Sequence, residues 1–336
     1  MKYFISLLLV LSCSACQIES NEVNLYSARK EALMKPLLDS FTEETGIKVN
    51  IISSKADALL KRIQSEGINS PADVLLTTDA GRLHRAKNAD IFTPIDSATL
   101  RNNIPTQYRD SESMWFGLSI RLRPIMFTEQ ANSALITRYE DLNNPELKGQ
   151  ICVRSSSNIY NQSLVSSMLE INGEQATEDW AKGFVANLAR NPQGGDRDQI
   201  RAAAVGQCSI AIANTYYLAQ MLANPEGHKD RQAAEKMRVF WPNQLDRGAH
   251  ANVSGAGLIK TAPNKTNAIK LIEFLSSEKA QEIYANVNYE YPVKKDIKVN
   301  PILTGWGEFK ADSIALEKLG LNNSKALKLM DRAGWK

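Results

Sequence analysis

The sequence contains few of the residues on which enzyme sites and soft-metal sites usually depend. Its 336 residues include only 3 His and 4 Cys. The nucleophile motif GxSxG, the zinc motif HExxH and the phosphate-binding P-loop are absent. These absences argue against a hydrolase, a metalloprotease or an NTPase. The histidines are far apart, and we expect His84 and His228 to be solvated and His250 to have a structural role.

Neither sign of charge dominates the chain. Lys and Arg number 40 against 37 Asp and Glu, which gives a formal net charge of +3. Such a small excess does not predict binding to nucleic acid or to an anionic membrane surface. With 43% hydrophobic and 23% charged residues, the composition is that of a globular protein, and the length predicts two domains.

Long hydrophobic runs are missing too, because no apolar segment after residue 16 is long enough to cross a bilayer. Residues 1–16 have a positive start, a short apolar core and small residues before Cys16, which is typical of an export signal. The segment resembles a bacterial lipoprotein signal, with lipid on Cys13 or Cys16, but ordinary cleavage after Ala15 fits equally well. We expect a periplasmic protein whose only membrane contact is such an anchor.

Two cysteines remain after the signal, Cys152 and Cys208, and each lies at the start of a strand-like run. An even pair in an oxidising compartment predicts a disulfide. Two buried free thiols are the alternative, because Cys also packs as a small apolar residue. The pair lacks the CxxC spacing of a redox or zinc site, so we expect a structural role in either case.

The first part of the exported chain alternates strand and helix patterns, which predicts a mainly parallel sheet covered by helices. We expect a helix capped by Ser27 and ended by Gly46. The expected elements are strands at 23–26, 47–52 and 72–77 and helices at 27–46 and 56–67.

The middle of the chain departs from this alternation of strands and helices. Residues 114–127 are typical of one long strand that crosses between two domains, and residues 250–260 are the natural returning connection. A second αβ series begins at Lys148. We therefore expect two hinged αβ lobes that close over a ligand. The first comprises residues 22–120 plus about 245–290, and the second residues 121–244 plus about 291–336.

Three tyrosines stand where strands give way to helices in the second lobe. Tyr216 and Tyr217 follow the strand that begins at Ser209, and Tyr160 follows the strand that begins at Ile151. Ligand sites in open αβ sheets lie beyond the carboxyl ends of the strands. Three phenols converging there would offer oxygen ligands to a hard cation, whereas ordinary packed aromatics are the alternative.

Several segments resemble one family, and they occur in order through almost the whole exported chain. The family is the periplasmic ferric-ion-binding proteins of bacterial ABC iron importers. The segments are NLYSAR (24–29), WFGLSIRLR (115–123), NIYNQ (158–162), NTYY (214–217), HANVSGAG (250–257) and EYPV (290–293).

The resemblance implies a two-lobed type II periplasmic-binding-protein fold that captures Fe³⁺ and delivers it to an ABC permease with its ATPase. The tyrosine ligands of the family correspond to Tyr160, Tyr216 and Tyr217. Three phenolates would neutralise the charge of a ferric ion. The resemblance also implies a carrier rather than an enzyme, and we expect a monomer.

The sequence departs from family members that add a His-Tyr pair from the first lobe, because Lys30 and Glu31 occupy those positions. Glu31 is a weak substitute, and a solvated residue in a first helical turn is the simpler interpretation. In related members carbonate or another small anion completes the metal shell. The candidates for holding it, or for packing behind the ligands, are Arg121 first, then Arg29 and Arg123, with Tyr26 as a packing residue and Asp79 as a helix cap.

Two other functions stay open. The same fold could bind a small organic solute or anion, such as thiamine, a polyamine or a phosphonate. An exported enzyme is the second alternative, although the missing motifs give it little support. Paired phenols near an arginine fit ferric iron better than an organic cation, which would require acidic and aromatic walls.

Overall fold

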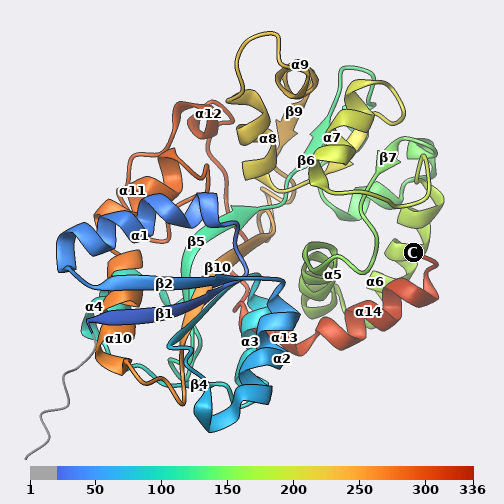
Figure 1. The fold of residues 1–336 in the computed structure, drawn as a ribbon. Coiled ribbons are helices and arrows are strands. Elements are labelled where there is room, and N and C mark those ends of the chain that lie inside the picture. Colours follow the sequence, from blue (N-terminus) through green and yellow to red (C-terminus); the bar gives the residue numbers. More distant parts are fainter. Residues whose placement is uncertain (1–20) are drawn as a thin grey trace, which may run out of the picture.

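The computed structural model describes residues 21–336, in two lobes that each surround their own β-sheet (Figure 1). The expected export signal, with Cys13 and Cys16, lies outside the described residues. Within them, no helix combines the length and hydrophobicity that a membrane span requires. The two-lobed αβ architecture predicted from the sequence is confirmed.

The first lobe contains a six-stranded sheet of order β2-β1-β3-β10-β4, with β5 also paired to β10. Strands β1, β2 and β3 are parallel, whereas β10 runs antiparallel to β3 and β5. The strands are β1 (Glu22–Ser27), β2 (Lys48–Ser53), β3 (Val74–Thr78), β4 (Phe92–Thr93), β5 (Phe116–Leu122) and β10 (Ala251–Ile259). The helices are α1 (Glu31–Thr45), α2 (Ala56–Glu66), α3 (Ala80–Asn88), α4 (Ala98–Asn103), α10 (Lys265–Leu275) and α11 (Glu278–Asn286).

Helix α1 shows how local sequence sets these elements. It buries one face through Met34, Leu37 and Phe41, and it ends at Gly46, whose φ of 70° is the left-handed conformation that glycine adopts without strain. The predicted cap at Ser27 is wrong. Ser27 is the last residue of β1, where it pairs with Ser53 of β2, and the N-cap residue of the helix is Lys30 instead, so the helix begins three residues later than its apolar pattern suggested.

The second lobe contains a four-stranded sheet of order β7-β8-β6-β9. Its strands are β6 (Ile125–Phe127), β7 (Ile151–Cys152), β8 (Ile210–Ile212) and β9 (Arg238–Phe240). Its helices are α5 (Ile159–Asn172), α6 (Glu174–Ala186), α7 (Asp196–Ala204), α8 (Thr215–Leu222), α9 (Lys229–Glu235) and α14 (Asn323–Arg332). Short 3-10 helices occupy Gly67–Asn69, Thr106–Tyr108, Ser133–Leu135, Glu140–Asn143 and Pro145–Leu147.

A disulfide joins Cys152 and Cys208, with an S–S distance of 2.02 Å. Cys152 ends β7, and Cys208 lies just before β8, its parallel neighbour in the sheet. The bond therefore ties together the two strands that lead into α5 and α8.

The expected long strand over 114–127 is two strands, one in each sheet. Strand β5 pairs with β10 in the first lobe and β6 pairs with β8 and β9 in the second. Pro124 lies between them, and a proline cannot donate to a strand ladder, so the pairing changes sheet at this point. The chain returns from the second lobe to the first between β9 and β10, as Figure 1 shows at the centre of the molecule.

The C-terminal segment packs on both lobes. We expected residues 291–336 to belong to the second lobe, but Leu303, Leu316 and Leu319 lie in the first-lobe core. Only the last part, from Ala326 to Trp335, packs in the second-lobe core. Helix α12 (Pro301–Thr304) and helix α13 (Glu317–Leu321) belong to this C-terminal segment. Helix α13 contacts both α3 of the first lobe and α5 of the second. The other predicted lobe boundaries remain predictions.

Candidate metal site between the lobes

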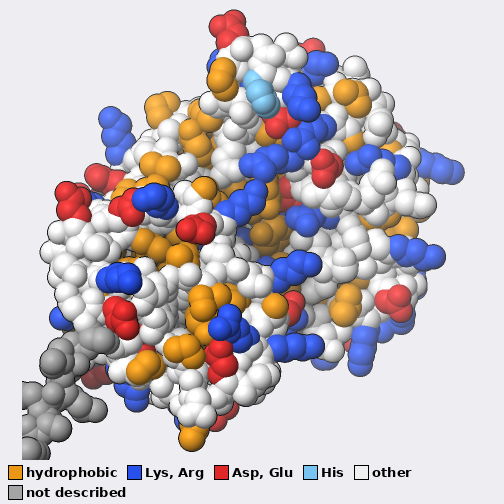
Figure 2. All heavy atoms as spheres, in the orientation of Figure 1, with side chains coloured by type: hydrophobic (Ala, Val, Ile, Leu, Met, Phe, Trp, Pro, Cys, Tyr) orange, Lys and Arg blue, Asp and Glu red, His pale blue; other side chains and the backbone are white. Residues whose placement is uncertain are grey.

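A cleft of about 340 Å³ lies between the lobes and is lined by side chains from both. Figure 2 shows this hollow near the centre of the view, with Lys and Arg side chains around its edge. The first lobe contributes Arg29, Lys30, Lys55 and Arg82, and the second contributes Tyr160, Arg197, Tyr216 and Tyr217.

The three predicted tyrosines meet in this cleft. Tyr160 is the second residue of α5, and Tyr216 and Tyr217 lie in the first turn of α8. The hydroxyl of Tyr216 donates to that of Tyr160 over 3.3 Å. The rings of Tyr216 and Tyr217 are 4.2 Å apart between centroids and inclined by 38°. The phenols thus come from two strand–helix junctions of one lobe, as the sequence predicted.

Arginines surround the phenols and make their pKa values unequal. The guanidinium carbon of Arg121 lies 5.2 Å from the ring centroid of Tyr160. Burial raises the pKa of Tyr160, but the charge of Arg121 and the hydrogen bond from Tyr216 lower it more, so the pKa falls below its usual value. The pKa values of Tyr216 and Tyr217 are raised, first by burial and then by the Tyr160 phenolate. Tyr160 is therefore the phenol that ionises first, and a bound cation would favour ionisation of all three.

Arg121 is the predicted anion-holding residue that retains a free terminal nitrogen, Nη1, within the part of the chain that the structure describes. It is buried at 2% exposure, and its Nη2 donates to the carbonyl of Val253 at 2.5 Å. Its Nε and Nη1 have no partner among the described residues. It lines a small cavity beside Tyr160, together with Asp79 and His250. A buried cation with unused donors is costly unless an oxyanion or water meets them.

The other two predicted arginines have both terminal nitrogens occupied, and only their Nε atoms lack a partner among the described residues. Arg29 forms a bidentate pair with Glu290, at 2.7 and 2.8 Å, and donates to Ser254. Arg123 donates to Asn161 at 2.6 Å and forms a buried ion pair with Asp196. Arg29 still lines the cleft, whereas Arg123 lies behind Tyr160.

Tyr26 packs in the first-lobe core and donates to the Glu66 carboxylate at 3.0 Å, and it does not line the cleft. One expectation for an individual residue, that for His84, is wrong. His84 is buried rather than solvated, because α13 approaches it so closely at Gly320 that a Cβ there would lie 2.3 Å from the histidine Cβ. Glu31 is exposed in the first turn of α1, in agreement with the simpler of its two interpretations, and it does not line the cleft. Its neighbour Lys30 does, so the first lobe presents no acidic ligand at the positions of the missing His-Tyr pair.

Asp79 caps α3, as predicted, by accepting from the amide of Gly81. Two of the histidines also behave as expected: His228 is exposed, and His250 is buried in the structure behind the cleft.

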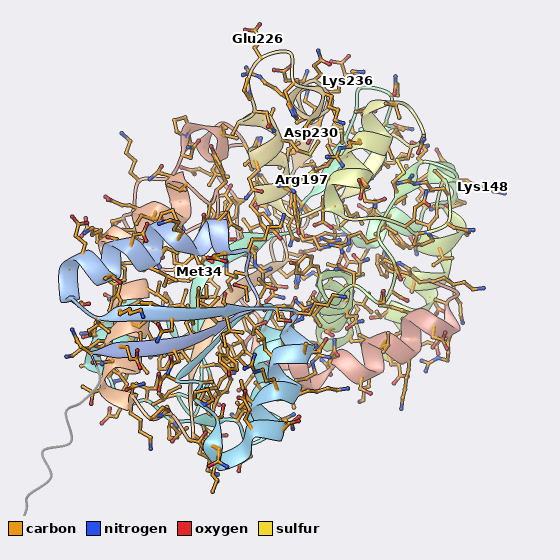
Figure 3. All side chains as sticks on the ribbon, viewed as in Figure 1. Met34, Lys148, Arg197, Glu226, Asp230 and Lys236 are labelled. Carbon is orange, nitrogen blue, oxygen red and sulfur yellow. A yellow bond between two sulfur atoms is a disulfide. The ribbon has the colours of Figure 1, made fainter. Side chains whose placement is uncertain are left out.

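Four basic residues at the rim of the cleft were missed. Lys30 precedes α1, Lys55 precedes α2, Arg82 is in the first turn of α3, and Arg197 is in the first turn of α7. Figure 3 labels Arg197 beside the gap between the lobes. A cation at a helix start adds to the positive end of the helix dipole instead of compensating it. For Lys30, Lys55 and Arg82, a position shortly after a predicted strand was the available signal. The described residues contain no group of three His, Cys, Asp or Glu that could hold a metal.

The chain is similar to known solute-binding and iron-binding proteins. Residues 69–306 match the family model of bacterial extracellular solute-binding proteins. Iron uptake protein A1 of Synechocystis sp. is 49% identical over 319 residues, which cover 95% of this chain and 88% of that protein. A Trichodesmium IdiA (FutA) structure in complex with iron and citrate ligands has a TM-score of 0.90 at 49% identity and covers 94% and 100% of the two chains. Apo ferric ion-binding protein A of Pasteurella haemolytica has a TM-score of 0.88 at 47% identity, with coverages of 94% and 98%.

Proposed function

Because the chain belongs to the bacterial extracellular solute-binding proteins, we propose that it captures Fe³⁺ in the interlobe cleft and delivers it to an ABC permease with its ATPase. The observation that carries the proposal is the convergence of Tyr160, Tyr216 and Tyr217 on one cleft wall. Similarity to an iron uptake protein and to iron-binding structures over nearly the full chain supports the choice of cargo.

In this proposal the three phenolates bind the metal directly. Ferric ion is a hard cation that prefers oxygen donors, and three phenolates balance its charge. Tyr160 ionises first because Arg121 lowers its pKa, and the arriving ion then displaces the protons of Tyr216 and Tyr217. The other cleft-lining carboxylates favour different partners, since Glu290 is paired with Arg29 and Asp57 with Arg85.

We propose that a small anion, carbonate or a carboxylate, completes the metal shell. A ferric ion bound by three phenolates is neutral, so it would not balance the positive charge of the basic rim. Lys30 and Lys55 of that rim have no ion-pair partner among the described residues. Arg121 offers two free donors beside Tyr160, and a guanidinium suits a planar oxyanion. Arg121 is therefore the first candidate to hold the anion, while Arg29 and Arg123 position their neighbours.

The family implies export to the periplasm and a permease partner. We propose in addition that the protein acts as a monomer, that it has no catalytic activity, and that Cys13 or Cys16 carries a lipid anchor. These statements rest on the sequence. Mass spectrometry of protein isolated from membranes would detect the lipid, and recovery of only unmodified, soluble protein would reject the anchor.

The proposed function is tested by the colour of the loaded protein. With ferric ion, the wild type should show a visible phenolate-to-iron charge-transfer band, and Tyr216→Phe should lose most of it. Tyr291→Phe is the matched control, because Tyr291 is also buried, its hydroxyl has no partner among the described residues, and it does not line the cleft. A colourless wild type that yields all its iron to a competing chelator would refute the assignment.

A further inference from the structure

Asp79 joins the two lobes through a buried contact near the hinge. Its backbone adopts a φ of 84°, which non-glycine residues rarely do, and its side chain is completely buried. Oδ1 accepts from the amide of Gly81 at 2.9 Å and from the hydroxyl of Ser163 at 2.7 Å, and Oδ2 accepts from Nδ2 of Asn252 at 2.9 Å. Gly81 and Asn252 belong to the first lobe, whereas Ser163 belongs to α5 of the second.

These contacts suit a side chain with two acceptor oxygens. The amide of Asn252 cannot rotate freely, because its Oδ1 already accepts from the backbone N–H groups of Ala80 and Val253 at 2.9 and 2.8 Å. Its Nδ2 must therefore point at Asp79. Two N–H groups and the Ser163 hydroxyl then converge on one side chain, and a carboxylate accepts from all three. An unusual backbone conformation held by such a set is a feature of functional sites.

The contact lies close to the metal site. Ser163 is three residues after Tyr160, so both side chains lie on the same side of α5 about one turn apart. Asn252 pairs in register with Arg121, the guanidinium nearest to Tyr160. The backbone at Gly81 is also close to α5, because a Cβ there would lie 3.5 Å from Cδ1 of Ile159.

We propose that the Asp79–Ser163 hydrogen bond is the pivot about which the lobes open and close. It holds the N-terminal turn of α5 against the first lobe, so that lobe movement and the placement of Tyr160 are coupled. Asp79 and Ser163 are in this sense positioning residues and not metal ligands. The coupling to Tyr160 rests on the proposed function, whereas the pivot itself does not.

Ser163→Ala tests the pivot, and Ser167→Ala is its matched control. Ser167 is equally buried one turn further along α5, but its hydroxyl donates to Leu164 within the same helix. We expect ferric ion to leave Ser163→Ala about tenfold faster than the wild type when an excess of chelator is added, as loss of a charge-assisted hydrogen bond would give. The charge-transfer band should shift in Ser163→Ala and stay unchanged in Ser167→Ala.

Small-angle scattering of the iron-free proteins separates this inference from the proposed function. Ser163→Ala should have a larger radius of gyration than Ser167→Ala, whether or not the protein binds iron. Asp79→Ala should behave like Ser163→Ala, because it removes the acceptor of the same hydrogen bond. A stability role alone would lower the melting temperature of Ser163→Ala but leave its scattering and release rate equal to those of Ser167→Ala. That result would overturn the pivot.

Discussion

The hydroxyl of Tyr216 donates to the hydroxyl of Tyr160 across 3.3 Å. The bond links α8 to α5, two helices that begin beyond neighbouring strands. The donor has its pKa raised by burial, and the acceptor has its pKa lowered on balance by Arg121 and by this bond. The two phenols therefore differ in acidity although they share one site.

The first prediction concerns this difference. Ultraviolet titration of the iron-free protein should reveal a tyrosine that ionises below the ordinary pKa of about 10. The early step should disappear in Tyr160→Phe, because the lowered pKa belongs to that phenol. It should persist in Tyr291→Phe, the phenol outside the cleft whose pKa is raised by burial. An early step that survives in Tyr160→Phe would contradict the assignment.

The second prediction concerns acid stability and His250. Burial, reinforced by Arg247, lowers the pKa of His250 to about 3, whereas an unfolded histidine has a pKa of about 6.5. As the pH falls from about 6.5 towards 3, the unfolded chain gains a proton that the folded protein does not, so stability is lost. The loss for this group approaches about 1.4 kcal/mol per pH unit.

Urea unfolding between pH 4 and 7 measures this loss. His250→Gln should depend less steeply on pH than the wild type, because the variant has no imidazole to protonate. His228→Gln is the control, since His228 is exposed and caps α9. Equal slopes in the wild type and His250→Gln would show that the buried imidazole does not set the acid limit.

The third prediction concerns the buried ion pair of Arg29 and Glu290. Both side chains are almost fully buried, and Ser119 also donates to the carboxylate. Removing one charge leaves the other unpaired in the interior, so Glu290→Gln should lower the free energy of unfolding by about 3 kcal/mol. The exposed pair Lys35–Asp39 is the comparison, and Lys35→Ala should change stability by less than about 0.5 kcal/mol. Denaturant titration of both variants measures the two changes in the free energy of unfolding, and equal changes would contradict the prediction.

The fourth prediction concerns the basic rim. If the rim attracts anionic iron chelates, Lys55→Glu should slow association with ferric citrate about threefold at low ionic strength, and added salt should reduce the difference. Lys61→Glu is the control, because Lys61 is exposed on the same helix but does not line the cleft. Stopped-flow absorbance at two salt concentrations gives both rates. Equal slowing by the two variants would show that only net charge matters.

Local patterns predicted the parts of the site that depend on neighbours in the sequence. Strand–helix alternation placed Tyr160 and Tyr216 at equivalent junctions, because the carboxyl ends of adjacent parallel strands lie at one sheet edge. Partners distant in the sequence were not predictable in this way. Glu290 is 261 residues from Arg29, and Glu66 is 40 residues from Tyr26. Only the folded chain shows that these contacts occupy the two terminal nitrogens of Arg29 and hold Tyr26 outside the cleft lining.

The same limit applies to the hinge and to His84. Residues 114–127 have a continuous strand pattern, and the change of sheet at Pro124 depends on which partner strands lie on each side. His84 has polar neighbours in the sequence, but Gly320, distant in the chain, allows α13 to cover it. Burial imposed by a distant segment leaves no periodic signal at the residue that it covers.

The disulfide between Cys152 and Cys208 closes a covalent loop with a sequence separation of 56 residues, which contains Tyr160, and it ties β7 to the chain just before β8. The strands that lead to Tyr160 and Tyr216 cannot separate while the loop is closed. The spacing of the phenols is therefore preorganised, and in the proposed site iron binding would lose little conformational entropy in bringing them together. On that proposal affinity would be set mainly within one lobe, and movement of the other lobe would govern how fast the metal is exchanged.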